Sequence, residues 1–207
     1  MSASFFVWTK PGTEAGEHLA DIIARKNAER IAGNGVFWWG IGNSLGPAVC
    51  EAAKAAGGTL PVIFCKMLGD AQSHDVTPTV TVRWKKWQDW DGKIADIPPF
   101  VRVTSRGVDR KGRDKRKHYA LVCRSDGPIV FDPNGRSFDP RCCLTHLGKV
   151  PGDSQITGLL QGDVNAPHHG ARYHIAFRAI LIFPWQATLL EPDPLPRHEQ
   201  PIKSKLP

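Results

Sequence analysis

In VFWWGIGNSLGP, residues 36–47, a short apolar segment runs directly into a glycine-rich turn that ends at a proline. The apolar part predicts a β-strand, and Pro47 favours the first position of a helix. Adjacent side chains of a strand point to opposite faces of its sheet, so Trp38 and Trp39 are expected to face different surroundings. One ring can then fill a core while the other lines a cleft, or both rings can be core side chains.

The turn after these tryptophans contains Gly40, Gly42 and Gly46, with Asn43 and Ser44 at its tip. Glycine allows close backbone approach and positive φ angles beside an aromatic ring. This combination predicts a pocket for a flat ring with amide donors at its rim. The alternative is a tight turn that has no ligand.

Size and composition predict one domain with a substantial core. The chain has 207 residues, of which 41% are hydrophobic, and no apolar run approaches the ~20 residues of a membrane span. The N-terminus lacks the basic start and apolar core of a secretory signal. Five cysteines without a framework spacing indicate reduced thiols and a cytoplasmic protein: Cys50, Cys65, Cys123, Cys142 and Cys143.

Positive charge is concentrated in one segment. The formal net charge is +7, and much of the excess lies between residues 102 and 118, where only Asp109 and Asp114 oppose the cations. Such a basic balance favours a polyanionic partner, most often nucleic acid, or is simply a solvated loop. The cations in this segment are Arg102, Arg106, Arg110, Lys111, Arg113, Lys115, Arg116 and Lys117.

The order of apolar and polar segments predicts an α+β protein with a curved mixed β-sheet or a small β-barrel, flanked by two N-terminal helices. One helix is expected after Thr13 and a second over residues 48–56. Strands are expected at 5–9, 36–39, 60–67, 79–87, 100–104, 118–123, 129–131, 156–160 and 173–183, with 118–123 and 129–131 forming a hairpin. Residues 1–190 are interpreted as a single domain with an elaborated 132–170 insertion, and 191–207 as a proline-rich tail that is extended or disordered.

The segments FFVWTKP (5–11), FWWG (37–40) and NSLG (43–46), in this order, resemble the EVE-like branch of the PUA superfamily. The resemblance extends over roughly residues 4–190 and implies a PUA-like barrel that binds nucleic acid. Relatives in this branch include readers of modified bases, which hold a base flipped out of a duplex in an aromatic cage. In a bacterial or phage setting, this implies a non-catalytic reader beside a nuclease or other defence machinery.

The resemblance also implies roles for particular residues. A flipped base needs an aromatic face to stack on, hydrogen-bonding groups for its edge and cations for the flanking phosphates. Trp38 or Trp39 would supply the face, and the backbone from Gly40 to Ser44, with the Asn43 amide, would supply the edge contacts. The phosphate contacts would come from Thr104, Ser105, Arg106, Arg110, Lys111, Arg113, Lys115, Arg116 and Lys117. We expect no cofactor, no metal and no membrane partner, while the choice between DNA and RNA stays open.

An alternative interpretation is a cysteine hydrolase. His118, followed by Asp132 and Asn134, is similar to the histidine strand and the next polar residue of papain-like peptidases and amidases. Cys50 precedes them in the appropriate chain order. A nucleophilic thiolate requires a helix N-terminus and an imidazole within ~3 Å, whereas Cys50 is expected about one turn inside its helix. The competing interpretation of Cys50 is a buried structural thiol.

Two further alternatives use other residues. Cys142, Cys143 and His146, with His168 or His169, have the ligand types of a zinc site but lack a second paired half. Trp84, Trp87 and Trp90 could cover one end of a sheet, in which case the chain would be an interaction module whose tryptophans all lie in cores.

Overall fold

The computed structural model describes residues 4–10, 19–42, 45–67, 81–101, 104–106, 118–132, 134–152, 155, 157–165, 168–169 and 171–194. These residues form two α-helices, α1 (Leu19–Ala32) and α2 (Gly46–Ala55), and a short 3-10 helix, η2 (Pro140–Cys142). They also form one eleven-stranded sheet. Its strands are β1 (Ser4–Thr9), β2 (Val36–Gly42), β3 (Thr59–Met67), β4 (Thr81–Gln88), β5 (Ile94–Asp96), β6 (Thr104–Arg106), β7 (His118–Arg124), β8 (Ser137–Phe138), β9 (Leu144–Thr145), β10 (Thr157–Gly162) and β11 (Tyr173–Pro194).

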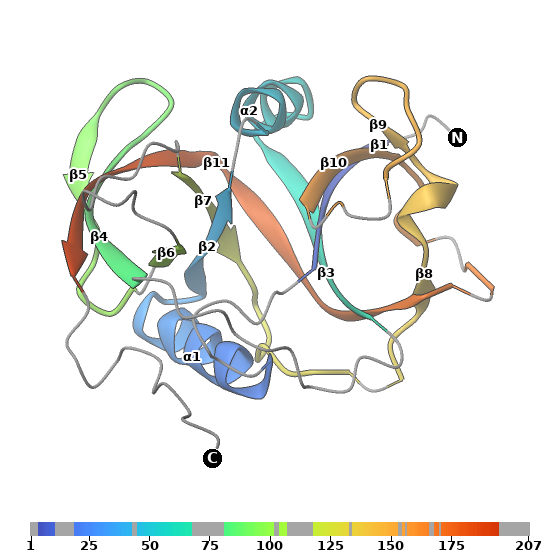
Figure 1. Cartoon of the computed structure of the whole chain (residues 1–207), viewed down its shortest axis with the longest axis horizontal. Coiled ribbons are helices and arrows are strands. Elements are labelled where there is room, and N and C mark those ends of the chain that lie inside the picture. Colours follow the sequence, from blue (N-terminus) through green and yellow to red (C-terminus); the bar gives the residue numbers. More distant parts are fainter. Residues whose placement is uncertain are drawn as a thin grey trace, which may run out of the picture.

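The sheet is organised around its longest strand, β11, which pairs with β3, β7, β4 and β8. The main path runs β2-β7-β11-β3-β1-β10-β9, and its pairings are antiparallel except between β1 and β3. The pairing register of β11 shifts after Ile175 and again after Leu181, and such irregularities bend a strand and increase its twist. In Figure 1, β11 sweeps across the whole molecule and the sheet curls into a rounded half on either side of it.

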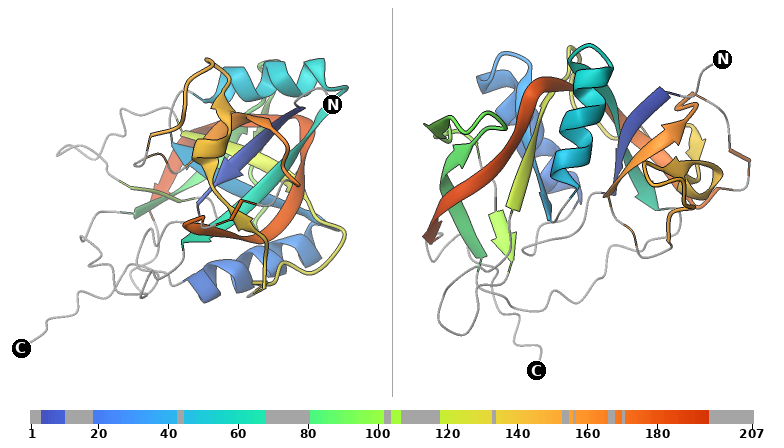
Figure 2. Two further views of the ribbon diagram at one scale, coloured as in Figure 1. Left: turned by 90° about the vertical axis from the view of Figure 1, so that its right-hand side faces the viewer. Right: turned by 90° about the horizontal axis from the view of Figure 1, so that it is seen from above.

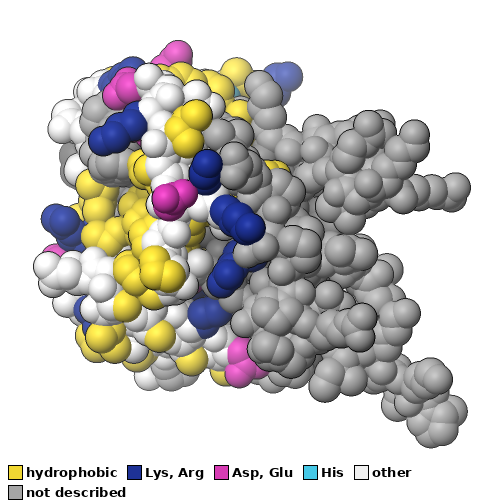
Figure 3. Space-filling view, turned by 90° about the vertical axis from the view of Figure 1, so that its left-hand side faces the viewer, with side chains coloured by type: hydrophobic (Ala, Val, Ile, Leu, Met, Phe, Trp, Pro, Cys, Tyr) yellow, Lys and Arg dark blue, Asp and Glu magenta, His cyan; other side chains and the backbone are white. Residues whose placement is uncertain are grey.

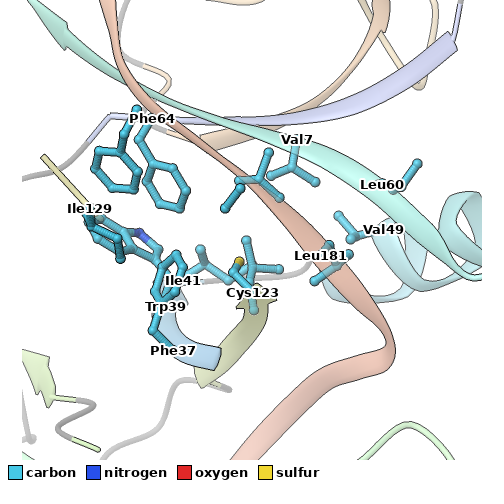
Figure 4. Packing of buried hydrophobic residues seen from close by; sticks show 14 of the residues in the cluster. Val7, Phe37, Trp39, Ile41, Val49, Leu60, Phe64, Cys123, Ile129 and Leu181 are labelled. Carbon is cyan, nitrogen blue, oxygen red and sulfur yellow. The ribbon is translucent and has the colours of Figure 1, made fainter. Parts of the chain in front are cut away.

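The central core lies between these two halves. Figure 4 shows side chains from β1, β2, β3, β7, β11 and α2 meeting there. Within it, the rings of Phe64 and Phe177 stack at 4.2 Å between centroids, 12° from parallel. Helix α2 packs against β11 and β3, and Figure 2 shows it between the two halves, with α1 on another side against β2.

Each half contains a smaller core of its own. On β1, Val7 points into the central core, while Phe6 and Trp8 point into the second core with Phe138 and Tyr173. Burial of both faces explains why β1 is a continuous apolar run without alternation. The third core is in the other half, and its members are Trp84, Trp87, Ile97, Val101 and Ala120.

The start of β2 is set by a tight turn after α1. Asn34 has φ 50° and Gly35 has φ 92°, both in the left-handed region that glycine and asparagine tolerate. At Gly33 a Cβ atom would lie 2.3 Å from the carbonyl oxygen of Val36, so a larger residue does not fit. The next helix, α2, has its proline within the first turn, as predicted for Pro47.

The predicted α+β class, with two helices and a large mixed sheet, is confirmed. A closed barrel is not present in the described part of the chain, since the main path of the sheet ends at β2 and β9. The predicted hairpin of 118–123 with 129–131 is wrong, because residues 129–131 are not a strand. Instead, the Ile129 main-chain N–H donates to Asn27 Oδ1, and that of Asp132 donates to the carbonyl of Ala176.

Two expected boundaries lie within the sheet. Residues 132–170 were expected to be an insertion, yet β8 within this range pairs with β11, and β9 pairs with β10. The tail was expected to begin at residue 191, yet β11 continues to Pro194, where Pro192 pairs with Trp84. Neither α1 nor α2 has the length and apolar character needed to cross a membrane.

Candidate functional site

The two adjacent tryptophans of β2 lie on opposite faces, as predicted. Trp39 is buried in the central core with 7% of its surface exposed. Its ring meets Phe64 edge-to-face at 4.6 Å and Phe177 at 6.4 Å between centroids. Trp39 therefore has a structural role and offers no face to a ligand.

Trp38 points the other way, onto the third core. It is partly buried against this core, whose members include Trp84, Trp87 and Ala120, and part of its surface remains accessible. Its indole Nε1 is buried and has no hydrogen-bond acceptor among the residues that the structure describes. An unsatisfied buried donor costs ~1–3 kcal/mol of stability.

Gly40 is the neighbour of Trp38 on the same face of β2, and it is exposed. It pairs with Ala120 of β7, so two small residues lie beside the Trp38 ring. A flat group that stacks against Trp38 can approach the backbone here without meeting a large side chain. Asn43 and Ser44, which were expected to supply further edge contacts, lie outside the described residues.

Helix α1 fixes the backbone of Trp38 at the free edge of β2. The Trp38 main-chain N–H donates to Glu29 Oε2 at 3.3 Å, and Lys26 Nζ donates to the Trp38 carbonyl. Lys26 and Glu29 are 4% and 2% exposed, and Lys26 Nζ lies 2.9 Å from Glu29 Oε2. This buried ion pair satisfies both main-chain groups of Trp38 and holds the ring in place.

The expected phosphate-binding residues are described only in part. Thr104, Ser105 and Arg106 form β6, which pairs with the start of β4, but their side chains lie outside the described part of the structure. Arg110, Lys111, Arg113, Lys115, Arg116 and Lys117 also lie outside the described residues.

The two strands that flank the basic segment in the sequence are described by the structure. The segment follows β6, and the strand after it, β7, begins at His118, which pairs with Gly42 of β2. Figure 3, which faces the half that contains β4 and β5, shows Lys and Arg side chains along one side of a hydrophobic area. Ile94 and Phe100, in and just after β5, are 58% and 40% exposed.

The residues of the hydrolase alternative are not brought together. The Asp132 main-chain N–H donates a hydrogen bond to the carbonyl of Ala176 on β11. Tyr119, the residue after His118, is paired with Thr188 on the same strand. Positions 176 and 188 are twelve residues apart on β11, so Asp132 and His118 lie beside different parts of this strand. Asp132 Oδ1 accepts the Asn134 main-chain N–H at 2.9 Å, so both candidates for the third catalytic residue lie near Ala176 and not near Thr188.

Cys50 also lacks the environment of a nucleophile. Its side chain is buried on α2, with 2% of the residue exposed, and burial raises the pKa of the thiol. A raised pKa disfavours the thiolate that attacks a substrate. The geometry therefore supports the structural interpretation of Cys50.

The zinc alternative has no support in the described residues, where no three potential ligands cluster. Cys142 is exposed and Cys143 is buried, and His168 Nδ1 accepts the Asp139 main-chain N–H at 2.8 Å. Trp90 is separate from the third core and lies beneath Lys54, whose Nζ is 5.9 Å from the ring centroid.

Two features of this site were missed in the sequence. Trp84 and Trp87 were considered only as cover for a sheet end, yet they belong to the core against which Trp38 packs. Lys26 and Glu29 were not recognised, although a Lys and a Glu three positions apart on an otherwise inward-facing helix stripe are a usable signal. Comparison with protein-family models, curated proteins and solved structures gives no match to this chain.

Proposed function

We propose that this chain is a non-catalytic nucleic-acid-binding module of PUA-like type, which reads a flipped or modified base by stacking it on Trp38. The observation that carries the proposal is the position of Trp38: partly exposed, set on a core with two further tryptophans, and beside the bare backbone of Gly40. Aromatic stacking is worth about 1–3 kcal/mol per base. The resemblance to EVE-like domains supports the same interpretation.

The edge of a stacked base would meet the backbone of Gly40. Main-chain groups of alternate residues in a strand point in the same direction. Those of Trp38 point away from β7, toward α1, so those of Gly40 also lie on the free edge of β2. One N–H and one C=O at Gly40 are a donor and acceptor set suited to a base edge.

Cations supply the sequence-independent part of the proposed binding. The chain carries a net charge of +7, and its most basic segment connects β6 to β7, the partner strand of β2. Neutralising phosphates releases counterions, so the affinity should fall steeply with salt. Cleavage of the nucleic acid is assigned to a separate nuclease partner.

The test is a titration of the full chain with labelled short duplexes that contain cytosine, methylcytosine or hydroxymethylcytosine, at two salt concentrations. Binding is followed by fluorescence anisotropy and by the intrinsic tryptophan signal. Trp38→Ala should abolish discrimination between the duplexes. Trp90→Ala is the matched control, because Trp90 is a partly buried tryptophan outside the third core.

Three outcomes are informative. Discrimination that is lost only in Trp38→Ala supports the reader. Salt-sensitive binding without discrimination between the duplexes would support nucleic-acid binding but contradict base reading at Trp38. Absence of binding at low salt overturns the proposal.

A further inference from the structure

Two arginines of the other half of the sheet are held side by side by one asparagine. Arg136 Nη1 donates to the Asn165 carbonyl at 2.8 Å. Arg178 Nη1 donates to Asn165 Oδ1 at 3.1 Å, and its Nη2 lies 3.5 Å from the Val164 carbonyl. The guanidinium groups come from the loop before β8 and from β11, so only the tertiary structure brings them together.

This arginine pair has no anionic partner in the described part of the chain, where no carboxylate lies within 4 Å of either guanidinium. The acidic residue of the same turn, Asp163, uses its Oδ1 to accept the Asn165 main-chain N–H at 2.8 Å. Burial and the nearby charge of Arg136 lower the pKa of Arg178. Two cations held together without a counterion are unfavourable, and a bound anion would relieve the repulsion.

The two guanidinium groups are held in a fixed arrangement before any anion binds. Val164 packs against the second core, and Arg178 belongs to the β11–β3 ladder, where it pairs with Ile63. Each guanidinium has five N–H donors, and the bonds described above use one from Arg136 and two from Arg178. Most of the donors therefore stay available in a rigid arrangement, and both residues are exposed.

We propose that Arg136 and Arg178, positioned by Asn165, form a binding site for a phosphate group. A phosphate offers three or more acceptor oxygens and up to two charges, which matches two guanidinium forks. The site lies in the half of the sheet that contains the second core, whereas Trp38 lies on the third core. It is therefore independent of base reading at Trp38.

The test uses the full-length chain and inorganic phosphate, followed by ³¹P NMR at low salt. Arg136→Gln and Arg178→Gln should each weaken binding about tenfold or more, as expected for the loss of charge-assisted hydrogen bonds. Arg178→Lys keeps the charge but loses the planar guanidinium with its paired N–H donors, so this variant should also bind phosphate more weakly. Arg124→Gln is the matched control, because it removes one exposed arginine from β7.

A second titration with a short unmodified duplex distinguishes two sources of the phosphate. A parallel loss of duplex affinity in the Arg136 and Arg178 variants assigns the site to a nucleic-acid backbone. Unchanged duplex affinity assigns it to a small phosphorylated molecule. Trp38→Ala should leave phosphate binding intact, so failure of the base-reading proposal is recognised separately.

The proposal is overturned if the wild-type chain does not bind phosphate at low salt. It is equally overturned if both glutamine variants bind phosphate as tightly as Arg124→Gln. Urea unfolding of every variant verifies that weaker binding is not caused by loss of the fold.

Discussion

The Glu29 carboxylate accepts the main-chain N–H of Trp38 at 3.3 Å, at the free edge of β2. Lys26 completes this contact by donating both to Glu29 and to the Trp38 carbonyl. An exposed strand edge is normally a site for unwanted pairing with other chains. Here a buried ion pair of α1 protects the edge at one residue and leaves the next outward-facing residue, Gly40, exposed.

Removing one partner of this ion pair should strongly destabilise the protein. Glu29→Gln takes the carboxylate from the buried Lys26, and Lys26→Met leaves the buried Glu29 with the longer Arg25 contact at 3.5 Å. The expected loss is up to about 3–5 kcal/mol in the free energy of unfolding, larger for Glu29→Gln. Urea denaturation measures this loss. The double variant Lys26→Met/Glu29→Leu should recover much of it, because it removes both charges. A double variant as unstable as the single ones would contradict this account.

The two tryptophans of β2 should respond differently to truncation. Trp39→Ala removes a ring from the central core and should cost about 3–5 kcal/mol of stability. Trp38→Ala removes a partly exposed ring, so we expect a smaller loss of stability together with loss of duplex discrimination. Denaturation curves and duplex titrations of the two variants provide the comparison. Equal destabilisation would show that Trp38 is as much a core residue as Trp39.

Thiol reagents should modify Cys142 before the other cysteines. Cys142 is exposed, whereas Cys50, Cys65, Cys123 and Cys143 are buried, and burial raises the thiol pKa of all four. Iodoacetamide labelling of the native chain, mapped by peptide mass, should find Cys142 first and the others after unfolding. Cys50→Ser should leave nucleic-acid binding unchanged. Rapid native labelling of Cys50 would instead revive the hydrolase interpretation.

The free energy of unfolding should decrease as the pH rises above about 9. Burial, with smaller effects of Cys142, Asp139 and Asp163, raises the pKa of Cys143 from 9.0 to about 11. The folded state therefore keeps this proton after the unfolded chain has lost it. The contribution is complete below pH ~9 and is lost as the pH rises toward 11, at most about 1.4 kcal/mol per pH unit.

Urea denaturation at several pH values between 8 and 11 tests this effect. Cys143→Ala should show a shallower decrease in the free energy of unfolding than the wild type. Cys142→Ala should change the dependence less than Cys143→Ala, since burial raises the pKa of Cys143 more than Cys142 does. Identical pH dependence of the wild type and Cys143→Ala would show that Cys143 ionises alike in both states.

Local patterns in the sequence were sufficient for most elements of the fold. The apolar runs at residues 5–9, 60–67 and 173–183 correspond to β1, β3 and the first part of β11. Residues 129–131 are equally apolar but do not form a strand. Their main chain is bonded to Asn27 of α1 and to β11, contacts between segments far apart in the chain that no local pattern reveals.

Only part of the candidate site could be predicted from the sequence. Strand alternation required Trp38 and Trp39 to diverge, because successive side chains of a strand point to opposite faces. Which of the two faces the inner core depends on the pairing of β2 with β7 and on the position of β4, and these are long-range contacts. The companion residues Trp84 and Trp87 could not be assigned to Trp38 for the same reason.

The sequence by itself determined the α+β class, the strand–turn–helix around Trp38 and the basic balance of the chain, because these follow from short-range periodicity and composition. Only the tertiary structure decided that Trp38 is the accessible ring, that Lys26 and Glu29 hold its backbone, and that Arg136 meets Arg178. Each of these depends on a contact between distant segments. Such contacts are selected by the packing of the whole sheet and not by the local preference of any residue.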